Sequence, residues 1–295
     1  MKKVKIITCI YSDLFGTELG GRIGRYHHYR YSLLSLLKMD NADFLCYTSD
    51  REIDDLKEFF YINNNISEQK LTLKVFDIKK TKFQEKIDEK KDIESIKKSD
   101  RCLEIQYSKF HWWWEETGEY DYYYWFDAGI SHAGLLPIKY LDYDNPNGVK
   151  KYFESSLFNN TFLENLINFS ENKIFVITKE NQKQFWSMTV NPKWYKNFSS
   201  KFHVIGGFFG GKKEKWGELV KTFENYLNNI IDEDGILPYE EQILSLMFYN
   251  NSELFVDKSF DIWWCRDSAP KETEDAYFIE NKSFYKILEE LNNIN

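Results

Sequence analysis

The spacing of apolar residues predicts alternating strands and helices in the first half of the chain. Residues 4–11 are β-branched and almost continuously apolar, which is typical of a strand covered on both faces. Between residues 23 and 37, apolar side chains recur at steps of three and four, as on a helix that buries one face. We also expect strands over residues 43–48 and 71–76, with a helix over 54–61 between them. Such alternation predicts a parallel α/β sheet.

The second half of the chain continues this pattern. Ser99-Asp100 is a suitable N-cap for a helix that we expect to reach about residue 116. The aromatic run YYYWF over residues 122–126 predicts a buried strand that ends at Asp127. Further elements are expected over residues 162–169, 174–178, 202–205 and 216–230, with another helix starting at Pro238. No internal repeat or Pro/Ser-rich linker interrupts the sequence, so a single domain over residues 1–295 is expected.

Composition and charge narrow the class of protein. Hydrophobic residues make up 42% of the chain, enough for a substantial core, and the formal net charge is −8. Binding a phosphate backbone requires a clustered positive surface, so no nucleic-acid partner is expected. No apolar run approaches the roughly 20 residues that span a bilayer, and Met1-Lys2-Lys3 leads into a strand and not into a signal peptide. We therefore expect a cytoplasmic protein without a transmembrane segment, and leave peripheral membrane contact open.

Cysteine and aromatic residues each suggest a simple interpretation. The four cysteines lie far apart without a CxxC pair, so reduced core thiols are expected and neither a zinc site nor a disulfide framework is indicated. Aromatic residues make up 18% of the chain. Their flat amphipathic rings suit stacking against sugars or nucleotides, and they also suit a large aromatic core, which is the interpretation that we favour.

Asp127 is the first candidate for chemistry. It follows an apolar strand and precedes Ala128 and Gly129, small residues that let a ligand approach the backbone. Open α/β sheets bind ligands at the carboxyl ends of their strands. A carboxylate there is suited to Mg²⁺ or Mn²⁺, whose Lewis acidity stabilises a leaving diphosphate. The alternative is a strand-end Asp that caps the next turn.

The string GGFFGG at residues 206–211 is the second candidate. Paired glycines around two aromatic rings leave bare backbone against which a hydroxyl-rich ligand can lie, so the string favours a sugar site. The alternative is a glycine-hinged turn that packs Phe208 and Phe209 into the core.

Glu240, Glu241 and Gln242 are expected in the first turn of the helix that starts at Pro238. Adjacent helical positions point about 100° apart, so at most one of the two carboxylates is expected to face a cleft. That carboxylate is a candidate nucleophile, base or charge stabiliser at an anomeric carbon. The alternative is ordinary stabilisation of the helix dipole.

Motifs of several other enzyme classes do not occur in the sequence. The glycines at positions 20, 21 and 24 have the wrong spacing for a GxGxxG fingerprint, and there is no Walker A string, GxSxG or HExxH. Arg22, Arg25 and Lys109 are candidates for phosphate contacts, but for each residue taken alone we favour a solvated surface charge.

In this order, Asp127, the GGFFGG string and the acidic helix start resemble a GT-A glycosyltransferase. Residues 124–132, YWFDAGISH, preceded by Tyr107-Ser108-Lys109, are similar to the bacterial HtrL/YibB family, a similarity that runs over residues 4–140. Residues 202–264 are similar to the blood-group A and B transferase family. The resemblance implies an α/β GT-A fold, Rossmann-like, with a mostly parallel central sheet flanked by helices and a smaller acceptor-side lobe. It also implies a nucleotide-binding half over residues 1–132 and an acceptor and sugar half over 133–295.

The resemblance further implies roles for residues of the nucleotide-binding half. Thr8, Tyr11 and Lys109 would lie near the base and ribose of the donor. Asp127 would take the first position of the family's DxD metal motif, with Mn²⁺ or Mg²⁺ as cofactor. The third position of that motif is Gly129, so another residue such as His132 or Asp261 would have to complete the metal site.

Roles in the sugar half follow in the same way. Gly207, Phe208 and Gln242 would neighbour the sugars, and Glu241 would face the reacting carbon, with Glu240 at the preceding acidic position. We therefore expect a hexosyltransferase that moves a hexose or N-acetylhexosamine from a nucleotide-diphosphate sugar, with UDP as the expected nucleotide, to a glycan or glycolipid hydroxyl. The alternative is a non-catalytic carbohydrate-binding protein on a degenerate GT-A scaffold.

Overall fold

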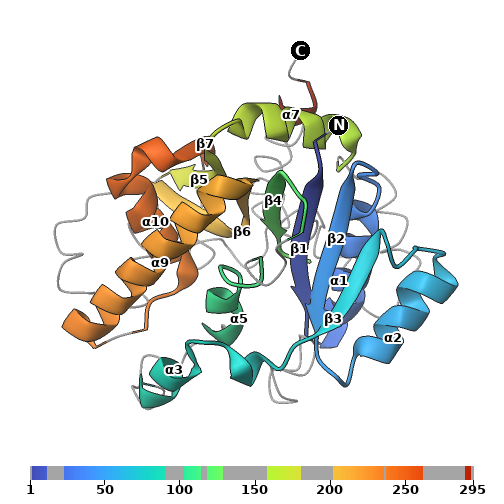
Figure 1. Ribbon diagram of the computed structural model, residues 1–295, viewed down its shortest axis with the longest axis horizontal. Coiled ribbons are helices and arrows are strands. Elements are labelled where there is room, and N and C mark those ends of the chain that lie inside the picture. Colours follow the sequence, from blue (N-terminus) through green and yellow to red (C-terminus); the bar gives the residue numbers. More distant parts are fainter. Residues whose placement is uncertain are drawn as a thin grey trace, which may run out of the picture.

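A mixed sheet lies at the centre of the molecule (Figure 1). The computed structural model describes residues 2–11, 23–90, 103–113, 118–128, 158–180, 202–235, 237–261 and 290–293. Within these residues the sheet has seven strands in the order β3-β2-β1-β4-β6-β5-β7. Their bounds are β1 (Val4–Ile10), β2 (Ala42–Thr48), β3 (Leu71–Val75), β4 (Tyr122–Phe126), β5 (Ile174–Glu180), β6 (Phe202–Lys212) and β7 (Phe255–Asp261).

Most neighbouring strands run parallel. β1 is parallel to β2 and β4, β2 is parallel to β3, and β5 is parallel to β7. β6 is antiparallel to both of its neighbours, β4 and β5. The predicted α/β class with a mostly parallel central sheet is therefore confirmed, with one reversed strand that the apolar pattern did not reveal.

Helices cover both faces of the sheet (Figure 1). Residues of α5, α9 and α10 pack on one face, and residues of α1, α2, η3 and α7 pack on the other. None of the described helices is long and apolar enough to cross a bilayer. The bounds are α1 (Ile23–Leu36), α2 (Ile53–Lys57), η3 (Glu58–Asn63), η4 (Ile78–Lys80), α3 (Gln84–Lys90), α5 (Leu103–Ser108), α7 (Asn160–Ser170), α9 (Lys213–Asp234), α10 (Glu240–Asn250) and η8 (Ser252–Leu254).

Aromatic side chains fill the core on both faces. The largest fully buried side chains of the described residues are all aromatic, with Trp112, Trp125 and Trp216 at their head. Successive residues of a strand face opposite sides of the sheet, and Phe208 and Phe209 accordingly lie in different core clusters. The favoured interpretation of the aromatic content, a large aromatic core, is therefore confirmed.

Two element boundaries differ from the sequence expectation, and one strand was not expected at all. The helix expected to reach residue 116 ends at Ser108, and the chain continues in turns to Trp113. The GGFFGG string is part of a strand and not a turn, because β6 extends through it to Lys212. Gly210 has a φ of 153°, and a Cβ there would collide with the backbone of Tyr123, so glycine lets β4 and β6 approach. Strand β7 was not expected, because its alternating sequence FVDKSFD carries only a short apolar pattern.

Candidate active site

Tyr11 and Asp127 directly follow β1 and β4, at the carboxyl ends of two neighbouring parallel strands. Strand order reverses between these two strands, because β2 and β3 continue on the other side of β1. In open α/β sheets, such a reversal is where ligands bind, outside the carboxyl ends of the strands. The fold therefore places the predicted Asp127 at the edge of the sheet where a ligand site is expected.

Lys109 is the centre of a charged cluster at this edge. The residue follows α5, and its side chain is only 5% exposed. Its ammonium nitrogen Nζ lies 3.1 Å from Asp127 Oδ1 and 2.9 Å from Glu240 Oε1. The same nitrogen donates a hydrogen bond to the carbonyl oxygen of Gly206 at 3.2 Å. The ends of α5 and β4, the start of α10 and the middle of β6 thus meet around one ammonium group.

Two neighbouring carboxylates keep Lys109 charged. Burial alone lowers the pKa of a lysine, but the carboxylates of Asp127 and Glu240 outweigh burial and raise the pKa of Lys109 above its usual value. The ammonium group also lies 5.2 Å from the centre of the Trp125 ring, whose face attracts a cation. Lys109 therefore carries a fixed positive charge between the two carboxylates at neutral pH.

Asp127 is the exposed member of the cluster. Its side chain is 45% exposed, compared with 6% for Glu240. Its Oδ1 accepts a hydrogen bond from Trp125 Nε1 at 2.7 Å, and its backbone N–H donates to the carbonyl oxygen of Gly207 at 2.8 Å. These contacts fix the orientation of the carboxylate while part of it stays open to solvent.

The two adjacent glutamates have different partners, as their separation around a helix requires. Glu240 is turned inward to Lys109, and its backbone N–H donates to Gln106 Oε1 at 3.1 Å. Glu241 is half-buried, and its Oε1 accepts the backbone N–H of Gly206 at 3.2 Å. Glu241 is therefore the glutamate that keeps an accessible surface next to the cluster.

Hydrogen bonds dock the start of α10 onto β6. The backbone N–H of Val204 donates to Ser245 Oγ at 2.9 Å, and that hydroxyl donates to the carbonyl oxygen of Glu241 at 2.6 Å. β4 pairs with β6 only as far as Phe208, so side chains of α10 bond to the backbone of β6 at Val204 and Gly206.

A hydrogen bond from α5 holds the chain just before α10. The hydroxyl of Tyr107 donates to the carbonyl oxygen of Pro238 at 2.6 Å. The acidic turn is thus held between α5 and β6.

Thr8 and Tyr11 are both buried near the carboxyl end of β1. Thr8 is fully buried, and its Oγ1 has no hydrogen-bond partner among the described residues. The Tyr11 ring stacks on Trp112 with a centroid distance of 6.5 Å, and its hydroxyl donates to the carbonyl oxygen of Phe76 at 2.9 Å. Burial raises the pKa of Tyr11. The nucleotide contacts expected of the two residues stay predictions.

Of the three residues expected near the sugars, one lies next to Asp127 and two are buried away from it. The carbonyl of Gly207 accepts the backbone N–H of Asp127, so the string and the strand-end residue lie side by side. Phe208 is fully buried on the opposite face of the sheet from the charged cluster, where its ring packs on Phe126, Phe162 and Phe175. Gln242 is also fully buried, and its Oε1 caps α10 by accepting the backbone N–H of Tyr239 at 2.8 Å. We therefore leave both side chains out of the proposed site.

In the part of the chain that the structure describes, Asp127 is the only predicted metal ligand whose side chain can be placed. Oδ1 of Asp127 already faces Lys109 and Trp125. Among the described residues, no three His, Cys, Asp or Glu side chains come together in a way that could hold a metal ion. Gly129 and His132 lie outside the described residues, as do Arg22 and the side chains of Arg25 and Asp261. The expected Mn²⁺ or Mg²⁺ stays a prediction that rests on Asp127 alone.

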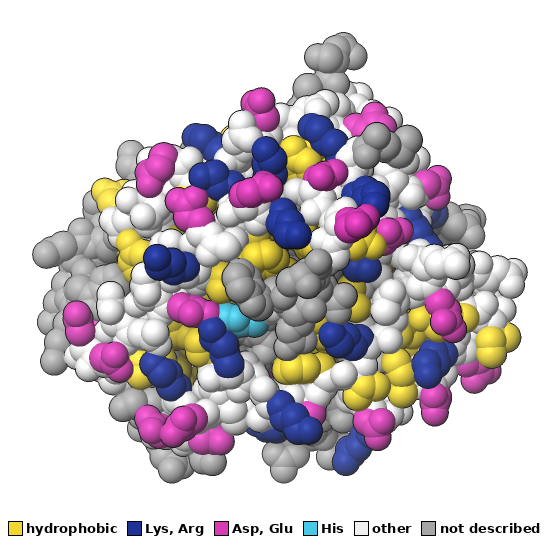
Figure 2. All heavy atoms as spheres, in the orientation of Figure 1, with side chains coloured by type: hydrophobic (Ala, Val, Ile, Leu, Met, Phe, Trp, Pro, Cys, Tyr) yellow, Lys and Arg dark blue, Asp and Glu magenta, His cyan; other side chains and the backbone are white. Residues whose placement is uncertain are grey.

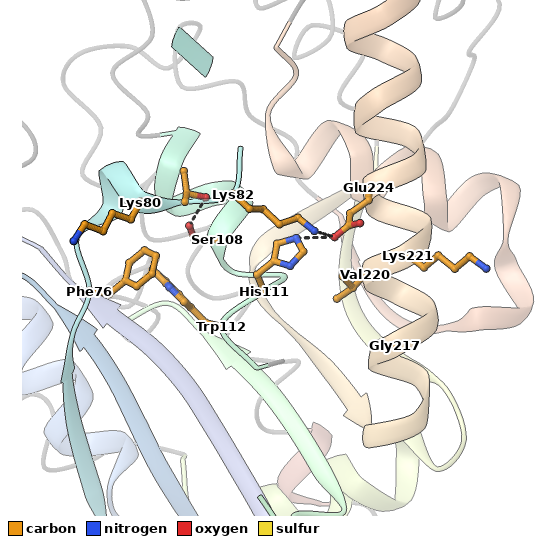
Figure 3. A pocket seen from close by; sticks show the side chains of 11 residues that line it. Phe76, Lys80, Lys82, Ser108, His111, Trp112, Gly217, Val220, Lys221 and Glu224 are labelled. Carbon is orange, nitrogen blue, oxygen red and sulfur yellow. Dashed lines mark hydrogen bonds and ion pairs between the residues drawn. The ribbon is translucent and has the colours of Figure 1, made fainter. Parts of the chain in front are cut away.

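A cavity of about 630 Å³ lies between η4, the turns after α5, and α9 (Figure 3). Its described walls include Phe76, Trp112 and Val220 but none of the predicted site residues. His111 and Lys82 both point to Glu224, and His111 Nε2 lies 2.9 Å from Glu224 Oε1. Burial, followed by the charge of Lys82, lowers the pKa of His111 to about 3, so His111 is neutral at physiological pH and this contact is not an ion pair.

Three contributors to the cluster were missed by sequence reasoning. Trp125 lies two residues before Asp127 and so faces the same side of β4, a relationship that strand periodicity could have shown. Gly206 belongs to the GGFFGG string, but its contacts with Lys109 and Glu241 join segments that are far apart in the sequence. Gln106, which receives the Glu240 backbone N–H, carried no sequence signal.

Charges on the face shown in Figure 2 are mixed. Lys and Arg side chains are interspersed with Asp and Glu side chains across this view. The charged cluster itself is distinguished by its burial and by its position at the carboxyl ends of β1 and β4.

Comparisons with known proteins identify the fold. No family model matches the chain, and no curated protein sequence matches it. Among solved structures, the apo form of mouse xyloside xylosyltransferase 1 superposes with a TM-score of 0.50 and 11% sequence identity, covering 94% of this chain and 93% of that one. The chain therefore has a GT-A-like fold.

A second solved structure is similar to a lower degree. It is 4-diphosphocytidyl-2C-methyl-D-erythritol synthase from Anaerococcus prevotii, with a TM-score of 0.43 and 10% identity, covering 96% of each chain. The narrower resemblances to the HtrL/YibB family and to the blood-group A and B transferases stay predictions, because no family model matches.

Proposed function

We propose that this protein is a glycosyltransferase that moves a hexose or N-acetylhexosamine from a nucleotide-diphosphate sugar, with UDP as the expected nucleotide, to a hydroxyl of a glycan or glycolipid. The observation that carries the proposal is the buried Lys109 ammonium between Asp127 and Glu240, at the point where strand order reverses. Glycosyl transfer is also the activity in the name of the mouse protein that shares the fold.

The charged cluster suits a reaction in which a diphosphate departs. The bond between the anomeric carbon and the diphosphate breaks with its electrons going to phosphate, and the acceptor oxygen forms the new bond to that carbon. The departing phosphate oxygen takes the proton of the acceptor hydroxyl. Because Lys109 neutralises part of the charge on Asp127 and Glu240, an anionic donor can approach the two carboxylates.

Glu241 is the residue that we place opposite the anomeric carbon. Positive charge develops at that carbon in the transition state, and a fixed carboxylate stabilises it. Glu241 is half-buried, and the Gly206 N–H holds one of its oxygens. Asp127, the exposed member of the cluster, orients the donor.

Calorimetric titration with UDP, with and without Mn²⁺, tests the nucleotide part of the proposal. Binding in either condition is expected, and no binding in both would contradict it. A comparison of the two titrations also tests the expected cation.

Slow hydrolysis of UDP-sugars then tests the catalytic part, because glycosyltransferases leak sugar to water. We expect Glu241→Gln to reduce hydrolysis by about 100-fold or more, while the exposed, remote Glu253→Gln leaves it unchanged. UDP-sugar binding without any hydrolysis by the unmodified protein would favour the carbohydrate-binding alternative.

A further inference from the structure

Gly206 contacts three charged side chains at the start of α10, those of Lys109, Glu240 and Glu241. Its carbonyl oxygen accepts from Lys109 Nζ at 3.2 Å, and its N–H donates to Glu241 Oε1 at 3.2 Å. A Cβ built on Gly206 would lie 2.7 Å from Glu240 Oε1 and 3.1 Å from both Cγ and Cδ of the same side chain. The Glu240 carboxylate therefore occupies the space that any other residue at position 206 would need.

An irregularity in the pairing of β6 leaves the N–H and carbonyl of Gly206 without partners in the neighbouring strands, so that both can bond to the charged cluster. Val176 of β5 pairs with Phe209, whereas the next residue, Ile177, pairs with Ile205. Residues 206–208 consequently lie outside the β5 ladder, and the pairing of β6 with β4 ends at Phe208. Bulges of this kind re-aim backbone groups next to functional sites. At Gly206 the released carbonyl and N–H point to Lys109 and Glu241 instead of a neighbouring strand.

We infer that Gly206 is a positioning residue of the site: its backbone and its missing side chain set where Lys109, Glu240 and Glu241 lie relative to one another. Its effect on turnover rests on the proposed function, whereas its effect on the Lys109–Glu240 contact does not. Any other residue could supply the same carbonyl and N–H, but its Cβ would occupy the space that the Glu240 carboxylate fills.

Three glycines, two in the string and one in α9, differ in what a methyl group in place of the α-hydrogen would meet. At Gly206 the obstructing atoms belong to the end of a flexible side chain, so the fold can accept the methyl by moving Glu240. At Gly210 the obstructing atoms include the backbone of Tyr123 and Tyr124, and φ is 153°, so the fold itself would be disrupted. At Gly217, in α9 (Figure 3), a methyl would meet nothing within 4 Å.

Gly206→Ala tests the inference, with Gly217→Ala as the matched control. We expect Gly206→Ala to fold and to bind UDP with unchanged affinity, and to hydrolyse the UDP-sugar on the order of 100-fold more slowly at saturation, because a displacement of about 1 Å has that effect. Gly217→Ala is expected to keep the original rate. The double variant Gly206→Ala/Glu240→Asp shortens the displaced side chain by one methylene and is expected to recover at least about tenfold of the loss.

A stability measurement tests the geometry without any turnover. Lys109→Met is expected to lower the melting temperature of the original protein clearly, and to lower it less in the Gly206→Ala background, where Glu240 has already moved away from Lys109.

Three results would overturn the inference: equal shifts of the melting temperature in the two backgrounds, an unchanged hydrolysis rate in Gly206→Ala, or a double variant that recovers no activity. Should Gly206→Ala not fold, the double variant decides, since its failure to fold as well would show that Glu240 is not what the methyl displaces. If no donor is hydrolysed by any variant, the proposed function fails while the melting temperatures still decide the role of Gly206.

Discussion

Lys109 and Glu240 are 131 residues apart in the chain, yet Lys109 Nζ and Glu240 Oε1 lie 2.9 Å apart with both side chains buried. A buried ion pair is costly to desolvate and becomes favourable only when further contacts satisfy both groups. Here Asp127 and the Gly206 carbonyl complete the surroundings of the ammonium. The pair fixes the first turn of α10, and with it Glu241, against the end of α5.

Removing either member of this pair should destabilise the protein. We expect Lys109→Met to lower the free energy of unfolding by about 3–5 kcal/mol, because it leaves the buried Glu240 without its counter-charge. Glu240→Gln should cost less, because Asp127 stays beside the Lys109 ammonium. The double variant should lose clearly less than the sum of the two single losses. Urea unfolding followed by circular dichroism measures all three values, and strict additivity would show that the two groups do not interact.

Asp127→Asn should separate function from stability. The side chain is 45% exposed, so its contact with Lys109 contributes little, and the free energy of unfolding should change by less than about 1 kcal/mol. UDP-sugar hydrolysis should fall by at least about 100-fold, since the amide cannot supply the charge that orients the donor. Asp50→Asn, at an exposed surface position, serves as the control. A stability loss of several kcal/mol in Asp127→Asn would instead assign this residue a structural role.

Phe208→Leu should act through the core alone. The ring is fully buried among Phe126, Phe162 and Phe175, and its replacement should cost about 1 to 2 kcal/mol of unfolding free energy. The KM for the donor should not change, which steady-state hydrolysis measured below the melting transition would show. A raised KM without loss of stability would return Phe208 to the sugar site.

Burial of neutral His111 should make stability depend on pH. Its pKa is lowered to about 3 in the folded state, first by burial and then by Lys82, whereas an unfolded histidine titrates near 6.5. The unfolded state therefore binds more protons between these values, so this contribution to stability is complete above about pH 6.5 and is lost as the pH falls toward 3.

Replacing His111 should flatten that dependence. We expect His111→Gln to melt at a temperature that changes less between pH 7 and pH 4 than that of the original protein. The comparison uses both proteins in the same buffers, so that His111 is the only side chain that differs between the two curves. Parallel curves would show that His111 takes up its proton in the folded state as readily as in the unfolded state.

The order of elements and the main candidate residues were accessible from the sequence. Apolar runs marked β1, β2, β3 and β4, and steps of three and four residues marked α1 and α9, because these signals arise from neighbours in the chain. Asp127 and the GGFFGG string were singled out separately, and the pairing of Phe126 with Phe208 brings them together. The expected strand ended at residue 205, whereas β6 continues through the string, because these glycines pair with β4, a strand more than 80 residues earlier in the chain.

The sequence by itself determined an α/β chain with an acid at the end of a buried strand and an acidic turn at a helix start, since strand and helix periodicity are local properties. Only the tertiary structure decided that β6 runs antiparallel, that Glu240 turns inward while Glu241 stays accessible, and that Lys109 lies between Asp127 and Glu240. Those outcomes depend on burial and on contacts between distant segments. Only the whole fold sets how the cost of removing a charged group from water compares with its attraction to an opposite charge.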